Sequence, residues 1–259
     1  MKKPVEISLA STLLFIVFCG VALLLPMAAS AHVSEQAFVL LLPTRAYILS
    51  GCISVLVSII IVAVIPASLL DRLFATTAIR IPIAPKSVLI SLSVLSTLSL
   101  FAICAVGFLG PRDPLINLLP LFFWTGFWVI LFVAAGVIGN FWIWLNPWSG
   151  VCYLILGRAA RRPPFKLSER LGIAPAICLF LLFFAFSIAD PAPDDPDRLA
   201  YIVLTYWLVN FAAMTAFGCE EWMRRGEAFT VFFDQISRVA VVKWAQGLSL
   251  GFPGWQLVK

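Results

Sequence analysis

Long apolar segments alternate with short polar loops along the whole chain. Six of these segments hold about 20 mostly apolar residues, the length at which an α-helix crosses the hydrocarbon of a bilayer. A single soluble core cannot bury a chain of 259 residues that is 62% hydrophobic. We therefore predict an all-α fold, a polytopic transmembrane helical bundle. Its spans are expected at 8–29, 47–70, 87–109, 115–138, 172–189 and 199–218.

Lysine and arginine lie almost entirely on one side of these predicted spans. With the N-terminus inside, the inner segments hold 15 of the 18 basic residues, and the outer segments hold only Arg45, Arg112 and Arg198. Inner loops of membrane proteins carry this excess, so the pattern predicts a multi-pass membrane protein with its N-terminus on the inner side. The net charge of +5 then reflects anchoring to the lipid bilayer, and it does not indicate a nucleic-acid partner.

The first segment, 1–31, allows two interpretations. A basic start, an apolar stretch and the small residues Ala29-Ser30-Ala31 are typical of a signal peptide cleaved before His32. The apolar stretch is also long enough for a first transmembrane helix, which would leave 32–218 as the rest of the bundle. Cleavage would make His32 the N-terminal residue, and its amine and imidazole together would favour copper. His32 is therefore a candidate metal ligand, although the chain has no second histidine.

The six cysteines are interpreted as small hydrophobic residues that pack within the bundle. No two of them form a C-x-x-C pair, and nearly all lie inside apolar segments. The sequence does not predict a disulfide framework. The cysteines are Cys19, Cys52, Cys104, Cys152, Cys178 and Cys219.

A tryptophan-rich segment, GNFWIWLNPW at 139–148, follows the fourth predicted span. Its aromatic residues fit an interfacial belt at the headgroups. Asn146-Pro147 should turn the chain, and the carbonyl groups freed by this turn must find partners or line a wet cavity. The alternative to a purely structural role is that Asn140 and Asn146 bind polar groups of a substrate or a partner. Asn210, inside the last span, is expected to hydrogen-bond between helices.

The C-terminal segment, 219–259, is predicted to form an amphipathic helix and a tail on the cytoplasmic side. Its apolar face would include Phe229, Phe233, Ile236, Ala240 and Trp244, and it would lie along the membrane interface or dock on a partner. The tail from Gly247 shows no obvious structure of its own. Glu227 and Asp234 are two helical turns apart, so these candidate catalytic carboxylates would share a face and could bind metal or move protons. Arg238, four residues after Asp234, offers the simpler alternative of an ion pair.

Two of these segments together resemble a known family. GNFWIWLNPW (139–148) followed by W-x-x-RGEAFTVFF (222–233) is similar to the paired motifs of the bacterial membrane family named fenitrothion hydrolase. His32-Val33-Ser34-Glu35, followed by LLLPT, also resembles that family. The resemblance implies hydrolysis of small organophosphorus triesters by a membrane complex of two different subunits, of which this chain would be one.

Triester hydrolysis requires an activated water and a polarised phosphoryl oxygen, commonly supplied through a divalent metal. The candidates are His32 on the outer side, or Glu227 and Asp234 on the inner side, and they cannot form one site across the membrane. Asn140, Asn146 and Arg225 are candidate substrate-binding residues that would orient substrate or stabilise negative charge. Whether this chain is itself catalytic stays open. The alternatives are a membrane component for copper handling and a non-catalytic assembly subunit.

Overall fold

The structure is a computed structural model that describes residues 44–75, 77–79, 85–157, 163–244 and 247–258. Within these residues the chain is mostly helical, and three helical stretches are long and apolar enough to cross a membrane. The helical class of the fold is confirmed, whereas the number of about six spans stays a prediction. The segment 1–31 and His32 lie outside the described residues. The three stretches are α4 (Lys86–Leu109), the run Leu118–Val137 and α10 (Pro196–Phe217).

The run Leu118–Val137 is built from three consecutive pieces. The short helix α5 (Leu118–Pro120) leads into η1 (Leu121–Leu131), whose turns are π-helical, and α6 (Phe132–Val137) completes the run. Asn117 begins it, because its buried side chain accepts a hydrogen bond from the Leu119 amide. Two further helices carry shorter apolar stretches, Arg45–Ile61 within α2 (Thr44–Val64) and the whole of α9 (Ala174–Ala189).

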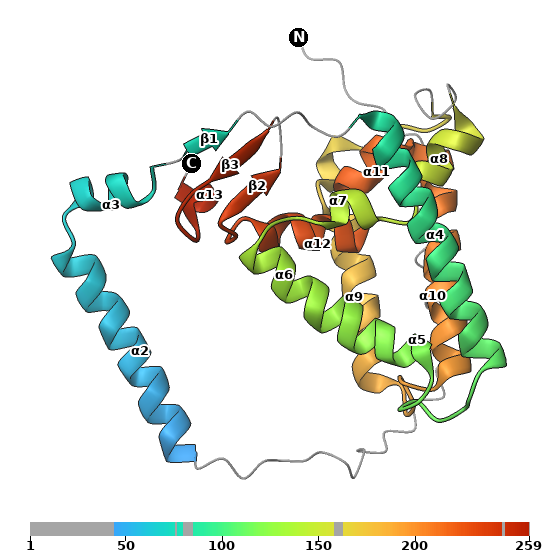
Figure 1. Cartoon of the computed structure of the whole chain (residues 1–259), viewed down its shortest axis with the longest axis horizontal. Helices are drawn as coiled ribbons and strands as arrows, with labels where there is room; N and C mark the ends of the chain where they lie inside the picture. The colour runs from blue at the N-terminus through green and yellow to red at the C-terminus, as the bar shows by residue number, and fades with distance from the viewer. Residues whose placement is uncertain (1–43, 76, 80–84, 158–162, 245–246, 259) are drawn as a thin grey trace.

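The second predicted span is interrupted by a proline. It was expected at 47–70, but α2 ends at Val64 and a separate helix, α3 (Ala67–Leu73), begins after Pro66. Proline has no amide hydrogen and disfavours helical backbone in the residue before it, so the helix stops there. Figure 1 shows α2, in blue, standing apart from the bundle around α4, α9 and α10. Its apolar side chains are exposed, which suits a surface in contact with lipid.

Aromatic side chains form the centre of the core. Phe127 of η1 meets Phe229 edge-on at 4.8 Å between ring centroids, and Trp142 and Phe233 lie 5.5 and 5.7 Å from the same ring. All four side chains are buried. Edge-to-face pairs of this kind add about 0.5–1.5 kcal/mol each to the burial of their surface. The two motif segments therefore meet in the core through their aromatic residues.

The C-terminal helix is shorter than predicted, and it packs inside the chain. α11 (Cys219–Arg225) precedes α12 (Ala228–Ser237), and α12 contacts α6 and α9. Phe232 on α12 stacks against Trp128 of η1, with 5.7 Å between ring centroids. The expectation of a helix on the interface or on a partner is therefore corrected, because the aromatic face of α12 finds its partners in this chain.

A small antiparallel sheet accompanies the helices of this mostly helical fold, and it corrects the expectation that the tail from Gly247 has no structure of its own. β1 (Thr77–Ile79) and β2 (Val242–Trp244) both pair with β3 (Leu248–Leu250), in the order β1-β3-β2. A last helix, α13 (Trp255–Val258), follows the sheet. Trp244 thus belongs to a strand and not to the amphipathic helix. The sheet fastens the segment after α2 and α3 to the C-terminal tail (Figure 1).

Gly139 is the position where the first motif meets this sheet. Its φ is +145°, and a Cβ atom there would lie 2.7 Å from the Trp244 Nε1 atom and 2.8 Å from the Val242 carbonyl oxygen. We expect Gly139→Ala to lower the free energy of unfolding by about 2 to 4 kcal/mol, because the new side chain meets both an unfavourable φ and a clash. The measurement is thermal unfolding of the purified protein, together with limited proteolysis of the C-terminal tail.

Gly126→Ala is the matched control for this substitution. A Cβ atom at Gly126 would make only ordinary contacts, the nearest at 3.5 Å to the Phe122 ring. In a helical stretch this exchange should be neutral or slightly stabilising. Equal behaviour of the two variants would contradict the close approach of Gly139 to β2.

Candidate functional site

Glu227 is the residue at which the two motifs meet. Its side chain is fully buried, and its carboxylate accepts five hydrogen bonds. Oε1 accepts from the Tyr206 hydroxyl at 2.5 Å and from the Phe229 amide at 3.0 Å. Oε2 accepts from the Thr230 amide at 2.6 Å, from the Thr230 hydroxyl at 2.5 Å and from the Trp142 indole at 3.3 Å. The buried carboxylate is therefore held by donors on every side.

The local sequence explains why Glu227 occupies this position. Gly226 ends α11, and Glu227 has extended backbone angles and caps the N-terminus of α12. The first amide groups of a helix lack partners within the helix and favour negative charge. The donors come from α10 (Tyr206), from the first motif (Trp142) and from α12 itself. Glu227 thus joins three segments that are distant in the sequence.

Asp234 does not join Glu227. Its side chain is 56% exposed and forms an ion pair with Arg238 at 3.2 Å between Nη2 and Oδ2. The prediction of a shared face assumed that the helix includes Glu227, whereas α12 begins only at Ala228. The carboxylate pair is therefore not formed. In the part of the chain that the structure describes, no group of three or more His, Cys, Asp or Glu side chains could hold a metal ion.

Arg225 is buried and fastens a loop to α11. Its side chain is 8% exposed, and Nη1 donates to the Glu221 carboxylate at 2.6 Å. Nε donates to the Gly172 carbonyl at 3.0 Å, and Nη2 donates to the Ser168 carbonyl at 2.5 Å. All three nitrogen atoms of the guanidinium group therefore contact the protein. This arrangement holds η3 (Glu169–Leu171) against α11 and accounts for a buried arginine without a substrate.

The stability that Glu221 contributes through its ion pairs with Arg224 and Arg225 depends on pH. Hydrogen bonds from Arg224 and Arg225 hold the pKa of Glu221 below its ordinary value of 4.5. Its contribution to stability is therefore complete above pH 4.5 and is lost as the pH falls through the lowered pKa, because the unfolded chain takes up the proton first. The effect should be at most about 1 kcal/mol, since a third of the side chain is exposed to solvent.

The measurement for Glu221 is the thermal unfolding midpoint between pH 7 and pH 3. We expect the Glu221→Gln variant to lose stability at pH 7 and to show a weaker decline in acid than the wild type. An unchanged acid decline in the variant would assign the pH dependence to other carboxylates.

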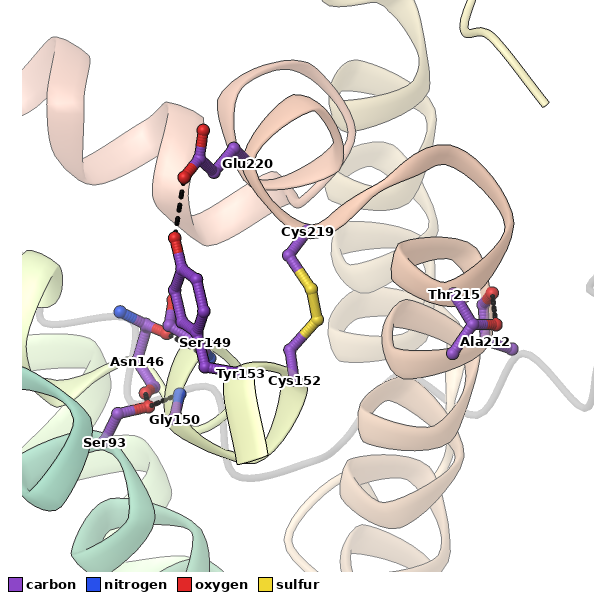
Figure 2. Close-up of a disulfide and its surroundings, with 10 residues drawn as sticks. All are labelled: Ser93, Asn146, Ser149, Gly150, Cys152, Tyr153, Ala212, Thr215, Cys219 and Glu220. Carbon is purple, nitrogen blue, oxygen red and sulfur yellow. Dashed lines mark hydrogen bonds between the residues drawn. A yellow bond between two sulfur atoms is a disulfide. The ribbon is translucent and has the colours of Figure 1, made fainter. Parts of the chain in front are cut away.

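The turn at Asn146-Pro147 finds protein partners for its freed carbonyl groups. Ser93 Oγ donates to the Asn146 carbonyl at 2.6 Å, as Figure 2 shows. Thr97 Oγ1 and Trp207 Nε1 lie 2.7 and 3.0 Å from the Pro147 carbonyl oxygen. The Asn146 side chain is buried, and its oxygen accepts from the Ser149 amide at 3.0 Å. The turn thus joins α4, α10, α7 (Trp142–Leu145) and α8 (Ser149–Leu156).

Two further asparagines have local roles in packing. Asn140 is half-buried, and its side-chain oxygen accepts from the Trp142 amide at 3.0 Å at the start of α7. Asn210 is fully buried, and its side-chain oxygen accepts from the Trp222 indole on α11 at 2.9 Å. The prediction that Asn210 hydrogen-bonds between helices is confirmed.

A disulfide bond is the main feature that the sequence did not predict. It joins Cys152 on α8 to Cys219 at the start of α11 (Figure 2). Both side chains are buried. Their separation of 67 residues and the lack of a C-x-x-C pattern left no local signal for this pairing. The expectation of six packing cysteines is therefore corrected for this pair.

The described surface has a shallow apolar groove of about 300 Å³ on α4 and α8. None of the residues proposed for chemistry from the sequence lines it. Comparisons of the chain with protein-family models, curated proteins and solved structures found no match. The resemblance of the two motifs to a hydrolase family therefore stays a prediction. The residues that line the groove are Ile90, Ser91, Val94, Leu95, Leu98 and Leu154.

Proposed function

We propose that this chain is one subunit of a membrane-integral hydrolase of organophosphorus triesters in the bacterial inner membrane. In this proposal a second integral membrane subunit is required for activity, and the described part of this chain supplies a scaffold for the complex. The observation that supports it is the buried contact between the motifs, where Glu227 of the second accepts from Trp142 of the first. The two motifs together suggest the family. The buried contact between Trp142 and Glu227 suggests that the motifs stabilise the fold of the subunit.

The division of labour follows from the chemistry of the motif residues. A general base needs access to the water that it activates, and a metal site needs several converging donors. Glu227 is enclosed by five donors, Arg225 is occupied by the loop at 168–172, and Asp234 is ion-paired at the surface. The described residues do not fit a divalent metal site. The groups that activate water are therefore assigned to the second subunit or to parts of this chain outside the described residues, such as His32.

A reconstitution experiment tests this function. Membranes are prepared with this chain alone, with the membrane protein encoded beside it alone, and with both, at matched levels of insertion. Fenitrothion is then added, and release of the nitrophenol is followed by absorbance. We expect hydrolysis only with both proteins. No hydrolysis in any membrane, with both proteins shown to be inserted, would overturn the proposal, and hydrolysis by this chain alone would overturn the scaffold role.

A further inference from the structure

Two adjacent residues of α8 contact two adjacent residues of α11. Cys152 is bonded to Cys219, and next to this bond the Tyr153 hydroxyl donates to the Glu220 carboxylate at 2.6 Å (Figure 2). The Cα atoms of the two cysteines are 6.5 Å apart, within the range found for disulfides. The covalent bond and the hydrogen bond together form a staple between α8 and α11.

The staple connects the two motif segments covalently. α8 begins directly after Trp148, the last residue of the first motif. α11 contains Arg225 and leads into Glu227, both of the second motif. Any change in this bond therefore acts on the relative position of the segments that meet at Glu227.

The compartment predicted for the staple is unusual for a permanent disulfide. The basic residues Arg224 and Arg225 follow Cys219, and the basic loop at 158–170 follows Cys152, so the positive-inside pattern places both cysteines on the cytoplasmic side. Glutathione and thioredoxin keep thiols reduced there, and cytosolic disulfides are generally transient, catalytic or redox-sensing. The charge pattern predicts a reducing compartment, whereas the structure contains a disulfide. Both observations are consistent with a pair that is oxidised and reduced reversibly.

We propose that Cys152 and Cys219 form a reversible thiol–disulfide couple that responds to the cytoplasmic glutathione pool. In the oxidising direction, one cysteine thiolate attacks glutathione disulfide and releases one glutathione thiolate. The second cysteine thiolate then attacks the mixed disulfide and releases the other. The pair is oxidised, one glutathione disulfide is reduced to two glutathione thiols, and the two cysteine protons go to solvent or to the released thiolates.

Burial sets the rate of this exchange. Cys152 and Cys219 are 0% and 3% exposed, so the folded chain must open locally before glutathione reaches them. The element that must move is α11, which has seven residues and follows Gly218, whose φ is +92°. Exchange is therefore slow compared with that of exposed thiols but does not require global unfolding.

The test uses the full chain in detergent micelles, with Cys19, Cys52, Cys104 and Cys178 replaced by serine. The protein is equilibrated in glutathione buffers from fully reduced to fully oxidised. Free thiols are then tagged with a large maleimide and counted by gel shift. We expect a reversible transition between two tagged thiols and none. The thermal unfolding midpoint should be lower by about 5 to 10 °C in the reduced form.

Single variants supply the controls in an otherwise wild-type chain. Cys152→Ser and Cys219→Ser should each abolish the redox-dependent shift of the unfolding midpoint. Cys178→Ser, which removes a cysteine outside the disulfide, should keep it. These readouts do not involve hydrolysis, so they stand or fall independently of the proposed function.

Two results would overturn the couple. The first is a pair that stays fully oxidised in excess reduced glutathione while the protein is folded, which would make the disulfide permanent. Labelling of introduced cysteines near α11 from outside intact cells would then show whether the orientation is the reverse of the prediction. The second is a pair that stays in the thiol form in every buffer, which would show that both cysteines act only in packing.

Discussion

Replacement of Glu227 by alanine is expected to lower the free energy of unfolding by about 3 to 5 kcal/mol, because the substitution leaves buried donors of this site without an acceptor. A buried donor that loses its acceptor costs about 1 to 3 kcal/mol, and loss of a helix N-cap costs about 1 kcal/mol. Glu227→Ala deprives the Tyr206 hydroxyl, the Thr230 hydroxyl and two amide groups of α12 of an acceptor. The Trp142 indole keeps the Thr230 hydroxyl oxygen as an acceptor at 3.0 Å. The protein around the new cavity can relax, so the total loss is smaller than the sum of these separate costs.

The measurement is thermal or denaturant unfolding of the purified protein in one detergent. Glu227→Gln should show about half of the effect, because the amide keeps one acceptor oxygen but brings an NH₂ group toward donors of the site. Asp234→Asn is the matched control, since Asp234 is a carboxylate on α12, the helix that Glu227 caps, but is exposed. Its unfolding free energy should change by less than about 0.5 kcal/mol.

The same variants separate a structural from a catalytic role. If Glu227→Gln folds with wild-type stability but abolishes hydrolysis in the assembled complex, the carboxylate acts in chemistry and the scaffold role is wrong. If hydrolysis falls only as far as the amount of folded protein falls, Glu227 acts through the fold.

The three span-length helical stretches could be predicted because each depends on composition over about 20 residues. The prediction at Asn146-Pro147 was also sound, since proline must free carbonyl groups and Ser93, Thr97 and Trp207 do satisfy them. Where several partners were possible, sequence alone could not choose among them. It allowed a wet cavity at this turn as readily as the hydrogen bonds to protein groups that the structure shows.

The role of Glu227 was missed because the helical period was extended across a break. The spacing of Glu227 and Asp234 was counted as two turns of one helix, although Gly226, the residue before Glu227, ends α11. Glutamate is also not among the residues that favour the N-cap, so no local rule identified it. The disulfide and the sheet were missed for a different reason. Strands of three residues are too short to show a period, and both features join segments far apart in the sequence.

Arg225 provides the second large effect, with a control next to it in the chain. We expect Arg225→Lys to lower the free energy of unfolding by about 2 to 4 kcal/mol, because a lysine cannot keep the three contacts that the guanidinium makes. Arg224 pairs with the same Glu221 carboxylate, but its side chain is 69% exposed and the Arg225 side chain is 8% exposed. Arg224→Lys should change stability by less than about 0.5 kcal/mol.

The two variants remove the same chemical group beside the same carboxylate, so the difference between them measures burial and the loop contacts. Proteolytic cleavage within the loop 163–172 should become faster only in Arg225→Lys. In that variant the carbonyl groups of Ser168 and Gly172 lose the guanidinium donors. Equal stability of the two variants would show that the loop is not fastened through Arg225. A loss of hydrolysis in Arg225→Lys without any loss of stability would return Arg225 to the role of binding negative charge in a substrate.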